Sequence, residues 1–428
     1  MRLVRVAVNG EQLLYQPPGG IGRYTAKLVT LLPRVFPDDQ VTVFTARHSA
    51  SQVANAWRAA GMGDGGEAVR LPLPRAALYE GWNTLGWPRL DRLAPVLGHV
   101  DVVHAPSVAV PPRSRAPLVV TVHDVASALF PETFPWHGRW FHARGLAAAA
   151  RRATLVITVS RSAAAEIQAH STIAADRLRI VPNGVDHIEA SAEEIVATRA
   201  RHGLDGAPYI LWVGTLEPRK DVGTLVRAFA DLVDSGQAAG HRLALAGPAG
   251  WLSSELVPAP LIERLGGAIR LLGTVGEGDL RALYAGATLF ALPSRHEGFG
   301  LPVLEAMAQR TPVVCSDIPA LREVSGAAAA EGGDGGPARA GAAGGGGPDK
   351  SAARAGACGP AGGATGAARL VAAGDVEAWA EALAGLMGDD AARRRLGQAG
   401  WAWAANFSWE RTVRETRAVY VEALGGGG

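Results

Sequence analysis

The stretch TLFALPSRHEGFGLPVLEAMAQRTPVVCSD, residues 288–317, contains one strand–helix–strand unit. Its first part, TLFALPS, and its last part, TPVVCSD, are short apolar runs without polar alternation. Such runs are typical of strands that are buried on both faces of a parallel sheet. Between them, PVLEAMAQ predicts a helix, with a proline that a first helical turn tolerates. The stretch therefore predicts a parallel α/β sheet with crossover helices.

The same alternation runs through both halves of the chain. In the first half, apolar strand patterns occur at 1–10, 41–46, 101–105, 117–124, 153–160 and 178–186. In the second half, they occur at 209–220, 241–250, 269–276, 288–294, 311–317 and 368–373. A polar connector at 190–208, which we expect to be poor in helix, separates the two sets. We predict two doubly wound, Rossmann-like domains, residues 1–190 and 191–408, that face each other across a cleft.

Composition excludes several classes of protein. The 428 residues include 48% hydrophobic and 19% charged residues, so the chain can build a large core and is not globally disordered. The 42 Lys and Arg against 40 Asp and Glu leave a net charge of +2, which does not indicate a nucleic-acid-binding protein. Two cysteines exclude a disulfide scaffold and a Cys-rich metal site. With no apolar run of about 18 residues and no signal-like N-terminus, we expect a cytoplasmic location.

One segment departs from this globular pattern. Residues 327–366 are almost entirely Gly, Ala and Pro with scattered charges. They lack the large apolar side chains whose burial would offset chain entropy. We predict a disordered insertion in the second domain, away from the cleft.

The loop before the predicted helix PVLEAMAQ, residues 302–309, is the strongest candidate site. Ligands of open parallel sheets bind beyond the carboxyl ends of the strands, where Glu297 lies. Gly298 and Gly300 permit close backbone approach, and the helix start offers N–H groups to an anion. Because carboxylates repel phosphate, Glu297 and Glu305 are suited to accept hydrogen bonds from sugar or ribose hydroxyls.

Three further motifs follow predicted strands. Adjacent Arg219 and Lys220 in GTLEPRKD suit a diphosphate. His123 ends the strand pattern PLVVTVHD, at the edge where a catalytic side chain would lie. GGIGRYT, residues 19–25, only superficially resembles a dinucleotide fingerprint and is interpreted as a glycine loop facing the cleft. The sequence has no Asp-x-Asp at a strand end and no His/Asp cluster with metal spacing, so we expect no metal and no cofactor.

Taken together, these motifs resemble the retaining glycosyltransferases of family 4, which have the GT-B fold and a Glu-x7-Glu motif. Glu297 and Glu305 have that spacing within HEGFGLPVLEAMA, and GGIGRYT, VVTVHD, VPNGVD, VGTLEPRK, SDIPALREV and FSWERTVRETRAVYVEAL extend the resemblance over nearly the whole chain. It implies a metal-independent hexosyltransferase that acts on a nucleotide sugar in polysaccharide biosynthesis. GTLEPRK with EGFGLPVLEAMA is most similar to bacterial mannosyltransferases, so GDP-mannose is the first expectation for the donor.

The resemblance also implies roles for individual residues. Glu297 would hold donor-sugar hydroxyls with the N–H groups around Phe299–Leu301, and Glu305 would bind the ribose. Arg219 and Lys220 would bind the diphosphate near Gly20, and His123 would contact the sugar near the reacting carbon. The loop around Val275 would hold the base, and a helix over 409–424 would pack back onto the first domain. One departure is Thr215, where the family often has arginine, which leaves the cationic role to Arg219 and Lys220. The full set of candidate site residues is Gly20, His123, Arg219, Lys220, Val275, Glu297, Gly298, Phe299, Gly300, Leu301 and Glu305.

The sequence leaves other functions open. The same fold could serve a nucleotide-sugar epimerase or an NAD-dependent dehydrogenase, although no acidic residue follows the strand pattern at 41–46 to bind a ribose. A non-catalytic glycan-binding relative is a further alternative, which the presence of both glutamates and both cations disfavours.

The acceptor is expected to be a glycan or a lipid-linked sugar. Aromatic and basic residues of the first half, Trp82, Trp87, Trp136, Trp140, Arg139, Arg144, Arg151 and Arg152, suit peripheral contact with the inner face of the plasma membrane. They equally suit an acceptor pocket or a packed surface between the domains, which we favour slightly.

Overall fold

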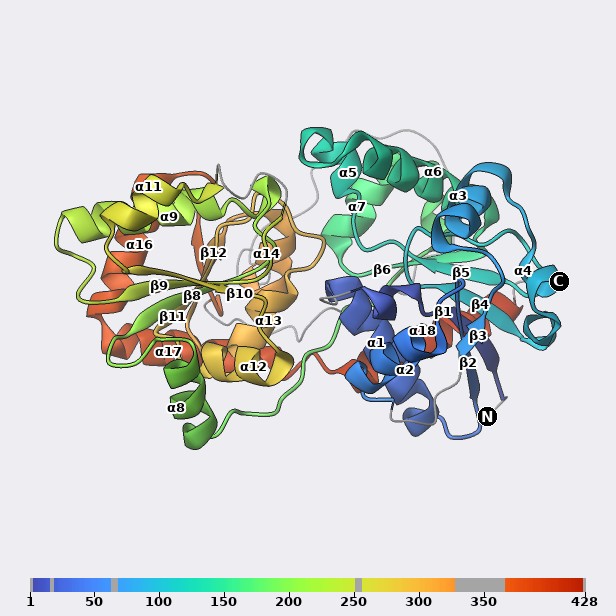
Figure 1. Ribbon diagram of the computed structural model, residues 1–428, viewed down its shortest axis with the longest axis horizontal. Coiled ribbons are helices and arrows are strands. Elements are labelled where there is room, and N and C mark those ends of the chain that lie inside the picture. Colours follow the sequence, from blue (N-terminus) through green and yellow to red (C-terminus); the bar gives the residue numbers. More distant parts are fainter. Residues whose placement is uncertain (1–2, 16–18, 63–67, 251–255, 328–365, 426–428) are drawn as a thin grey trace, which may run out of the picture.

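The computed structural model describes residues 3–15, 19–62, 68–250, 256–327 and 366–425. Residues 328–365, nearly all of the predicted insertion, lie outside the described residues. The rest forms two parallel sheets flanked by helices, shown side by side in Figure 1. This confirms the predicted fold of two doubly wound sheets.

The first sheet has seven strands in the order β3-β2-β1-β4-β5-β6-β7, all paired in parallel. The strands are β1 Arg5–Asn9, β2 Gln40–Thr45, β3 Ala68–Arg70, β4 Val102–Ala105, β5 Leu118–Thr121, β6 Leu155–Thr158 and β7 Leu178–Ile180. Every residue of β4, β5 and β6 is buried, as expected for strands covered on both faces.

Two layers of helices cover this sheet (Figure 1). The helices of the first domain are η1 Glu11–Leu14, α1 Gly20–Val35, α2 Ala50–Ala59, α3 Arg75–Leu85, α4 Leu90–Leu93, η2 Pro95–His99, α5 Ala126–Leu129, η3 Pro131–Thr133, α6 Trp136–Arg152, α7 Arg161–His170 and η4 Ala175–Arg177. Trp82 and Tyr79 of α3 belong to the core on one face, and Tyr24 of α1 and Trp57 of α2 belong to the core on the other.

The second sheet has six parallel strands in the order β10-β9-β8-β11-β12-β13. Its strands are β8 Tyr209–Val213, β9 Arg242–Ala246, β10 Ile269–Gly273, β11 Leu289–Leu292, β12 Val313–Ser316 and β13 Arg369–Val371. Its helices are α8 Ala192–Arg201, η5 Pro218–Lys220, α9 Val222–Asp234, α11 Ala259–Arg264, α12 Glu277–Gly286, α13 Leu301–Ala308, α14 Pro319–Val324, α16 Val376–Gly388 and α17 Asp390–Ala404.

Helix α8 shows that one prediction was wrong. The connector at 190–208, expected to be poor in helix, contains the ten residues of α8. Ser191 and Glu194 form a reciprocal capping box that starts this helix, because each side chain accepts a hydrogen bond from the other's backbone N–H. The polar composition that suggested a loop belongs to a helix with only Thr198 fully buried.

The chain crosses between the two sheets twice, and the crossings lie against each other. Val185 bridges to Ser408, and the His187 Nε2–H donates a hydrogen bond to the Phe407 carbonyl at 2.9 Å. An ideal Cβ on Gly184 would lie 2.2 Å from the Trp409 nitrogen, so only glycine fits here.

After the second crossing, α18, Trp409–Gly425, packs on the first sheet beside α1. Its Arg417 is buried and donates two hydrogen bonds to the carboxylate of Asp39. Tyr420, also buried, contacts His104 at the end of β4 through a 2.7 Å hydrogen bond.

Candidate active site

The candidate site lies where the strand order of the second sheet reverses, between β8 and β11. At such a switch point the loops after the two strands diverge and leave room for a ligand. The loop after β8 carries Arg219 and Lys220, and the loop after β11 carries Ser294 and Glu297. The Arg295 N–H donates to the Arg219 carbonyl at 2.9 Å, so the two loops hold each other in register.

Glu297 is the centre of this cluster and is only 6% exposed. Its Oε1 accepts hydrogen bonds from Lys220 Nζ at 2.6 Å and from Ser294 Oγ at 2.7 Å. Arg219 Nη1 lies 3.8 Å from Oε2. Burial alone would raise the pKa of Glu297, but the charges of Lys220 and Arg219 outweigh it and lower that pKa. The carboxylate is therefore ionised at neutral pH.

Arg219 is held in place by two hydrogen bonds from its terminal nitrogens. It donates to the His296 carbonyl at 3.1 Å and to the Glu217 carboxylate. Burial works against its charge, but Glu297, Glu217 and Asp124 together raise the pKa of the guanidinium. Its Nε is buried and has no hydrogen-bond partner among the described residues. This N–H is therefore an unsatisfied polar group beside Glu297.

The start of α13 completes this side of the site. Gly300 precedes the helix with φ of 96°, and an ideal Cβ there would lie 2.6 Å from Leu321 Cδ2. Both facts require glycine. Leu301 and Pro302 then begin the eight-residue helix. Phe299, by contrast, is buried in the hydrophobic core of the second domain. Its ring packs edge-on against that of Phe407, with the ring centroids 6.2 Å apart.

The first domain brings His123 against this cluster. An ideal Cβ on Gly298 would lie 2.4 Å from the His123 carbonyl oxygen, so the missing side chain lets the two domains touch. The His123 Nε2–H donates to the Pro106 carbonyl at 3.0 Å, which leaves Nδ1 as the acceptor. Burial lowers the pKa of His123, and the imidazole is neutral at pH 7.

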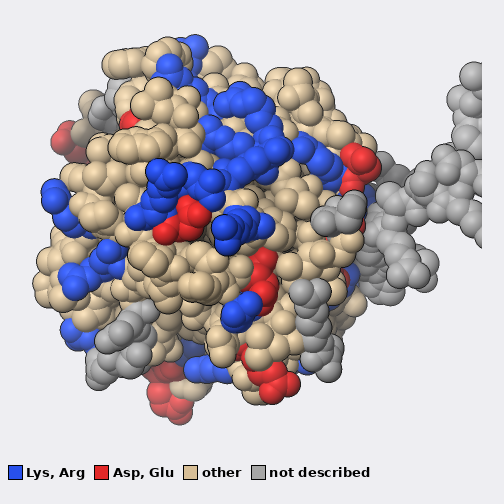
Figure 2. Space-filling model, turned by 90° about the vertical axis from the view of Figure 1, so that its right-hand side faces the viewer, with Lys and Arg blue, Asp and Glu red and all other residues tan. Residues whose placement is uncertain are grey.

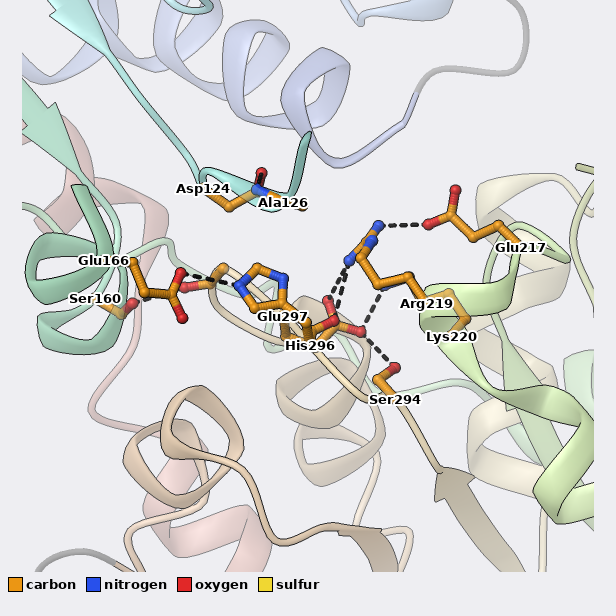
Figure 3. Close-up of polar contacts among 11 residues, drawn as sticks. Asp124, Ala126, Ser160, Glu166, Glu217, Arg219, Lys220, Ser294, His296 and Glu297 are labelled. Carbon is orange, nitrogen blue, oxygen red and sulfur yellow. Dashed lines mark hydrogen bonds and ion pairs between the residues drawn. The ribbon is translucent and has the colours of Figure 1, made fainter. Parts of the chain in front are cut away.

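Further contacts cross the cleft beside His123, and Figure 3 shows several of them. Ser160 Oγ donates to the Gly298 carbonyl at 2.6 Å while accepting from the Ala163 N–H, which caps α7. His296 Nε2 lies 2.9 Å from Glu166 Oε2. The carboxylate of Glu323 on α14 accepts from the first N–H groups of α7, at Arg161 and Ser162.

Glu305 lies apart from the Glu297 cluster. It forms an ion pair with Arg23 of α1, and Tyr284 donates to its Oε2 at 2.9 Å. It borders a cavity of about 360 Å³ that neither Glu297 nor Lys220 lines. The cavity is lined by Arg23, Lys27, Gly184, Val185, Asp186, Ile188, Glu277, Gly278, Leu280, Arg281, Tyr284, Glu305, Gln309 and Trp409.

Two further candidate residues, Gly20 and Val275, do not line this cavity. Gly20 is in the first turn of α1 and not in a loop, since the helix begins there. An ideal Cβ on Gly20 would lie 3.8 Å from Leu301 Cδ1, so α1 abuts the start of α13. Val275 lies in the loop before α12 and packs against the hydrophobic core of the second domain. Glu277, two residues further along the chain, lines the cavity.

Several residues of the site were not predicted from the sequence. Ser294 and Glu217 support Glu297 and Arg219, and both lie inside sequence stretches already quoted. Asp124, next to His123, is partly buried and accepts from the Ala126 N–H. Burial tends to raise the pKa of Asp124, but the charge of Arg219 and the Ala126 hydrogen bond lower it. Arg23 could be found only from its contact across the domains.

Comparison with known proteins agrees with this architecture. Residues 18–189 match the family described as Glycosyltransferase Family 4, and residues 207–336 match Glycosyl transferases group 1. The O-antigen chain mannosyltransferase B of Escherichia coli is 32% identical over 334 residues, which cover 76% of this chain and 85% of that protein. The chain belongs to glycosyltransferase family 4.

Other glycosyltransferases are similar to this chain over shorter stretches. The D-inositol 3-phosphate glycosyltransferase of Nocardia farcinica is 32% identical over 257 residues, which are 58% of this chain and 48% of that protein. The chain thus spans about half the length of that relative.

Solved structures match the whole fold. Sucrose-phosphate synthase from Thermosynechococcus elongatus has a TM-score of 0.70 at 19% identity and covers 100% of both chains. HepE of Anabaena, in complex with UDP and glucose, has a TM-score of 0.68 at 18% identity and covers 98% of this chain and 100% of that one. The solved structures show the GT-B fold, and the family domains together with the mannosyltransferase relative show that the chain is a hexosyltransferase.

None of the helices in the described ranges is long and apolar enough to cross a membrane. Within those same ranges, no three His, Cys, Asp or Glu side chains are grouped so that they could hold a metal ion.

Proposed function

We propose that this glycosyltransferase moves mannose from GDP-mannose to a glycan or lipid-linked acceptor, with retention at the anomeric carbon and without a metal. The similarity to E. coli mannosyltransferases supports the sugar, since O-antigen chain mannosyltransferase B aligns over most of both chains. The observation that carries the proposal is the buried cluster of Lys220, Arg219 and Glu297 at the switch point of the second sheet.

Stabilisation of the departing diphosphate is the first role of this cluster. When the bond from the anomeric carbon to the phosphate oxygen breaks, its electron pair stays on that oxygen and the charge on the diphosphate grows. The cationic side chains of Lys220 and Arg219 and the first N–H groups of α13 are suited to receive this charge. Fixed donors and cations in a site of low dielectric can supply such stabilisation without a metal.

Same-face attack is the mechanism that the carboxylates of the site support. The carboxylate of Glu297 accepts hydrogen bonds from Lys220 and Ser294, and that of Asp124 accepts one from the Ala126 N–H. Neither carboxylate is therefore free to act as a nucleophile. The acceptor oxygen then bonds to the anomeric carbon on the side that the diphosphate leaves. The acceptor proton passes to the departing phosphate oxygen, which balances the step.

The remaining roles follow from position. Glu297 accepts hydrogen bonds from hydroxyls of the sugar, and His123 contacts the sugar from the opposite domain, where the His123 backbone touches Gly298. Glu305 binds the ribose at the edge of the 360 Å³ cavity. Gly20 lets α1 approach the diphosphate beside Leu301.

We further propose peripheral contact of the first domain with an anionic lipid surface at the inner face of the plasma membrane. Trp82 is buried and has no part in it, but Trp87, Trp136 and Trp140 are 63%, 74% and 55% exposed. Helix α6 carries four arginines and no acidic residue, and Arg144 stacks on Trp140. Figure 2 shows Lys and Arg gathered over part of the outer face of this domain. Exposed indoles among arginines suit an anionic interface.

A vesicle assay tests the membrane contact. Wild-type protein should sediment with vesicles that contain phosphatidylglycerol and not with pure phosphatidylcholine, and Trp136→Ala with Trp140→Ala should abolish this. Equal sedimentation of the double variant would refute the proposal.

Nucleotide binding and product configuration test the proposed reaction. GDP should raise the melting temperature of the protein more than UDP, ADP or dTDP does, because a ligand stabilises the state that binds it. The mannoside formed from GDP-α-mannose should have the α configuration by NMR. A β-linked product would exclude retention, and a larger shift with UDP would exclude the GDP donor.

A further inference from the structure

Asp221, the residue that follows Lys220, has a backbone conformation that side chains seldom adopt. Its φ of 45° and ψ of 36° lie in the left-handed region, where Cβ crowds the following carbonyl oxygen. Among the described residues, three other than glycine have a positive φ, and Asp221 is the one that adjoins a candidate site residue. Such a conformation persists only where the surrounding structure imposes it, and it is most frequent at functional sites.

This conformation determines the direction of Lys220. The short helix η5 ends at Lys220, and α9 begins at Val222, so Asp221 alone separates them. If Asp221 were right-handed, η5 would continue into α9 and Lys220 would project from the side of one continuous helix. Instead the chain turns at Asp221, and Lys220 Nζ reaches Glu297 Oε1 at 2.6 Å (Figure 3). The position of the Lys220 ammonium therefore depends on the backbone of its neighbour.

The carboxylate of Asp221 is held by the other loop of the site. Asp221 is buried, and its Oδ2 accepts a hydrogen bond from Arg295 Nε at 2.9 Å. The Asp221 side chain makes no capping hydrogen bond to α9, which lies entirely within the described residues. The backbone N–H of Arg295 donates to the Arg219 carbonyl, also at 2.9 Å. Arg295 thus binds the residues on both sides of Lys220, one through its backbone and the other through its side chain.

We propose that Asp221 and Arg295 are positioning residues that hold Lys220 where charge grows on the departing diphosphate. The inference rests on the proposed function, in which Lys220 receives that charge. A fixed cation stabilises a transition state only from the correct position, and a small displacement lowers the rate steeply. Loss of the Asp221–Arg295 ion pair should therefore lower kcat and change the KM for the donor less.

Transfer kinetics of Arg295→Ala test this role, because Arg295 is exposed and its loss should leave the melting temperature unchanged. With GDP-mannose as the donor, kcat should fall about 10-fold, the cost of losing one charge-assisted hydrogen bond. Arg295→Lys, which keeps the charge, should recover part of the loss. Arg264→Ala is the matched control, since it removes an exposed ion pair with Asp234 at the other end of α9 and should behave as wild type.

Two variants of Asp221 separate the side chain from the backbone. Asp221→Gly adopts the left-handed conformation without strain but lacks the carboxylate, so its kcat should match that of Arg295→Ala. Asp221→Ala also resists the conformation, so its kcat should fall further. A wild-type kcat in Asp221→Gly would overturn the role of the ion pair.

A double variant shows whether Arg295 acts through Lys220. In the Lys220→Ala background, Arg295→Ala should lower kcat by less than about 2-fold, because the side chain that it positions is gone. An equal fall in both backgrounds would overturn the positioning role, as would an unchanged kcat in Arg295→Ala alone, and neither result would touch the proposed reaction. Full activity in Lys220→Ala would instead overturn the proposed role of the cluster, and this inference with it.

Discussion

The guanidinium of Arg23 on α1 forms an ion pair with the carboxylate of Glu305 on α13, so a residue of the first domain holds the second glutamate of the Glu-x7-Glu pair. Tyr284 donates to the other oxygen of Glu305 at 2.9 Å. The orientation of Glu305 therefore depends on the two domains being closed together. This contact links the closure of the cleft to the part of the site that we assign to the ribose.

Removing Arg23 should weaken donor binding. In Arg23→Ala, Glu305 loses its partner across the cleft, and we expect KM for the donor to rise about 10-fold, the usual cost of losing one charged contact. We expect kcat to change less, because the Lys220 cluster is untouched. Steady-state kinetics with varied donor measures both. Arg34→Ala, at the exposed end of the same helix, is the control and should behave as wild type; an unchanged KM in Arg23→Ala would contradict this role of the ion pair.

A side chain at Gly298 should prevent productive closure. An ideal Cβ there would lie 2.4 Å from the His123 carbonyl oxygen and 3.0 Å from Asp124 Cβ. Gly298→Ala must push the domains apart, and a displacement of about 1 Å at a reacting centre costs about 100-fold in rate. Transfer assays should show this loss while circular dichroism stays unchanged. Gly388→Ala, where the added Cβ meets nothing within 4 Å, should keep full activity.

His104 makes stability depend on pH. It is fully buried between Tyr420 and Thr121, and burial lowers its pKa from 6.5 to about 3. In the unfolded chain His104 binds a proton near pH 6.5, whereas in the folded chain it binds one only near pH 3. The free energy of unfolding should therefore fall as pH drops through that window, by up to about 1.4 kcal/mol per pH unit from this group.

Urea unfolding of wild type and His104→Gln at pH 7, 6 and 5 measures this contribution. The variant should show a flatter dependence on pH. The slope should not vanish, because burial also lowers the pKa of His123. Equal slopes in the two proteins would contradict the assignment to His104.

The chain on either side of the Gly/Ala-rich segment meets in space. An ideal Cβ on Gly366 would lie 3.7 Å from Ala327 Cβ. Deleting residues 330–364 should therefore leave the described fold joined without strain, and transfer activity and melting temperature should stay at wild-type values. Loss of transfer in the deletion variant would show that the segment contributes to function.

The sequence predicted what depends on local pattern and topology. Apolar runs without alternation located the strands. Because ligands of parallel sheets bind beyond the carboxyl ends of the strands, the loops with Glu297, Arg219 and Lys220 were predicted to lie at one edge. This prediction does not need the order of the strands, because in a parallel sheet every loop that follows a strand lies at the same edge. In the structure, Glu297, Arg219 and Lys220 do lie together at that edge.

The misses have physical causes of two kinds. GGIGRYT, which superficially resembles a dinucleotide fingerprint, was interpreted as a glycine loop, but α1 begins at Gly20 despite the low helix propensity of glycine. The contacts of Arg23 with Glu305, Ser160 with Gly298 and Glu323 with α7 join residues more than a hundred positions apart. No local pattern encodes them, so only the folded arrangement of the two domains shows them.

The most direct test of the account is transfer by variants of the buried pair that Lys220 and Glu297 form at 2.6 Å. With GDP-[14C]mannose and a mannose-ended oligosaccharide acceptor, wild type should form a labelled product. Lys220→Ala should lower the rate at least about 100-fold, as expected when a donor to a developing anion is lost. Glu297→Gln, which can keep its hydrogen bonds to Ser294 and Lys220, controls for folding and should also lose transfer. Full activity in a folded Lys220→Ala variant would contradict the central claim.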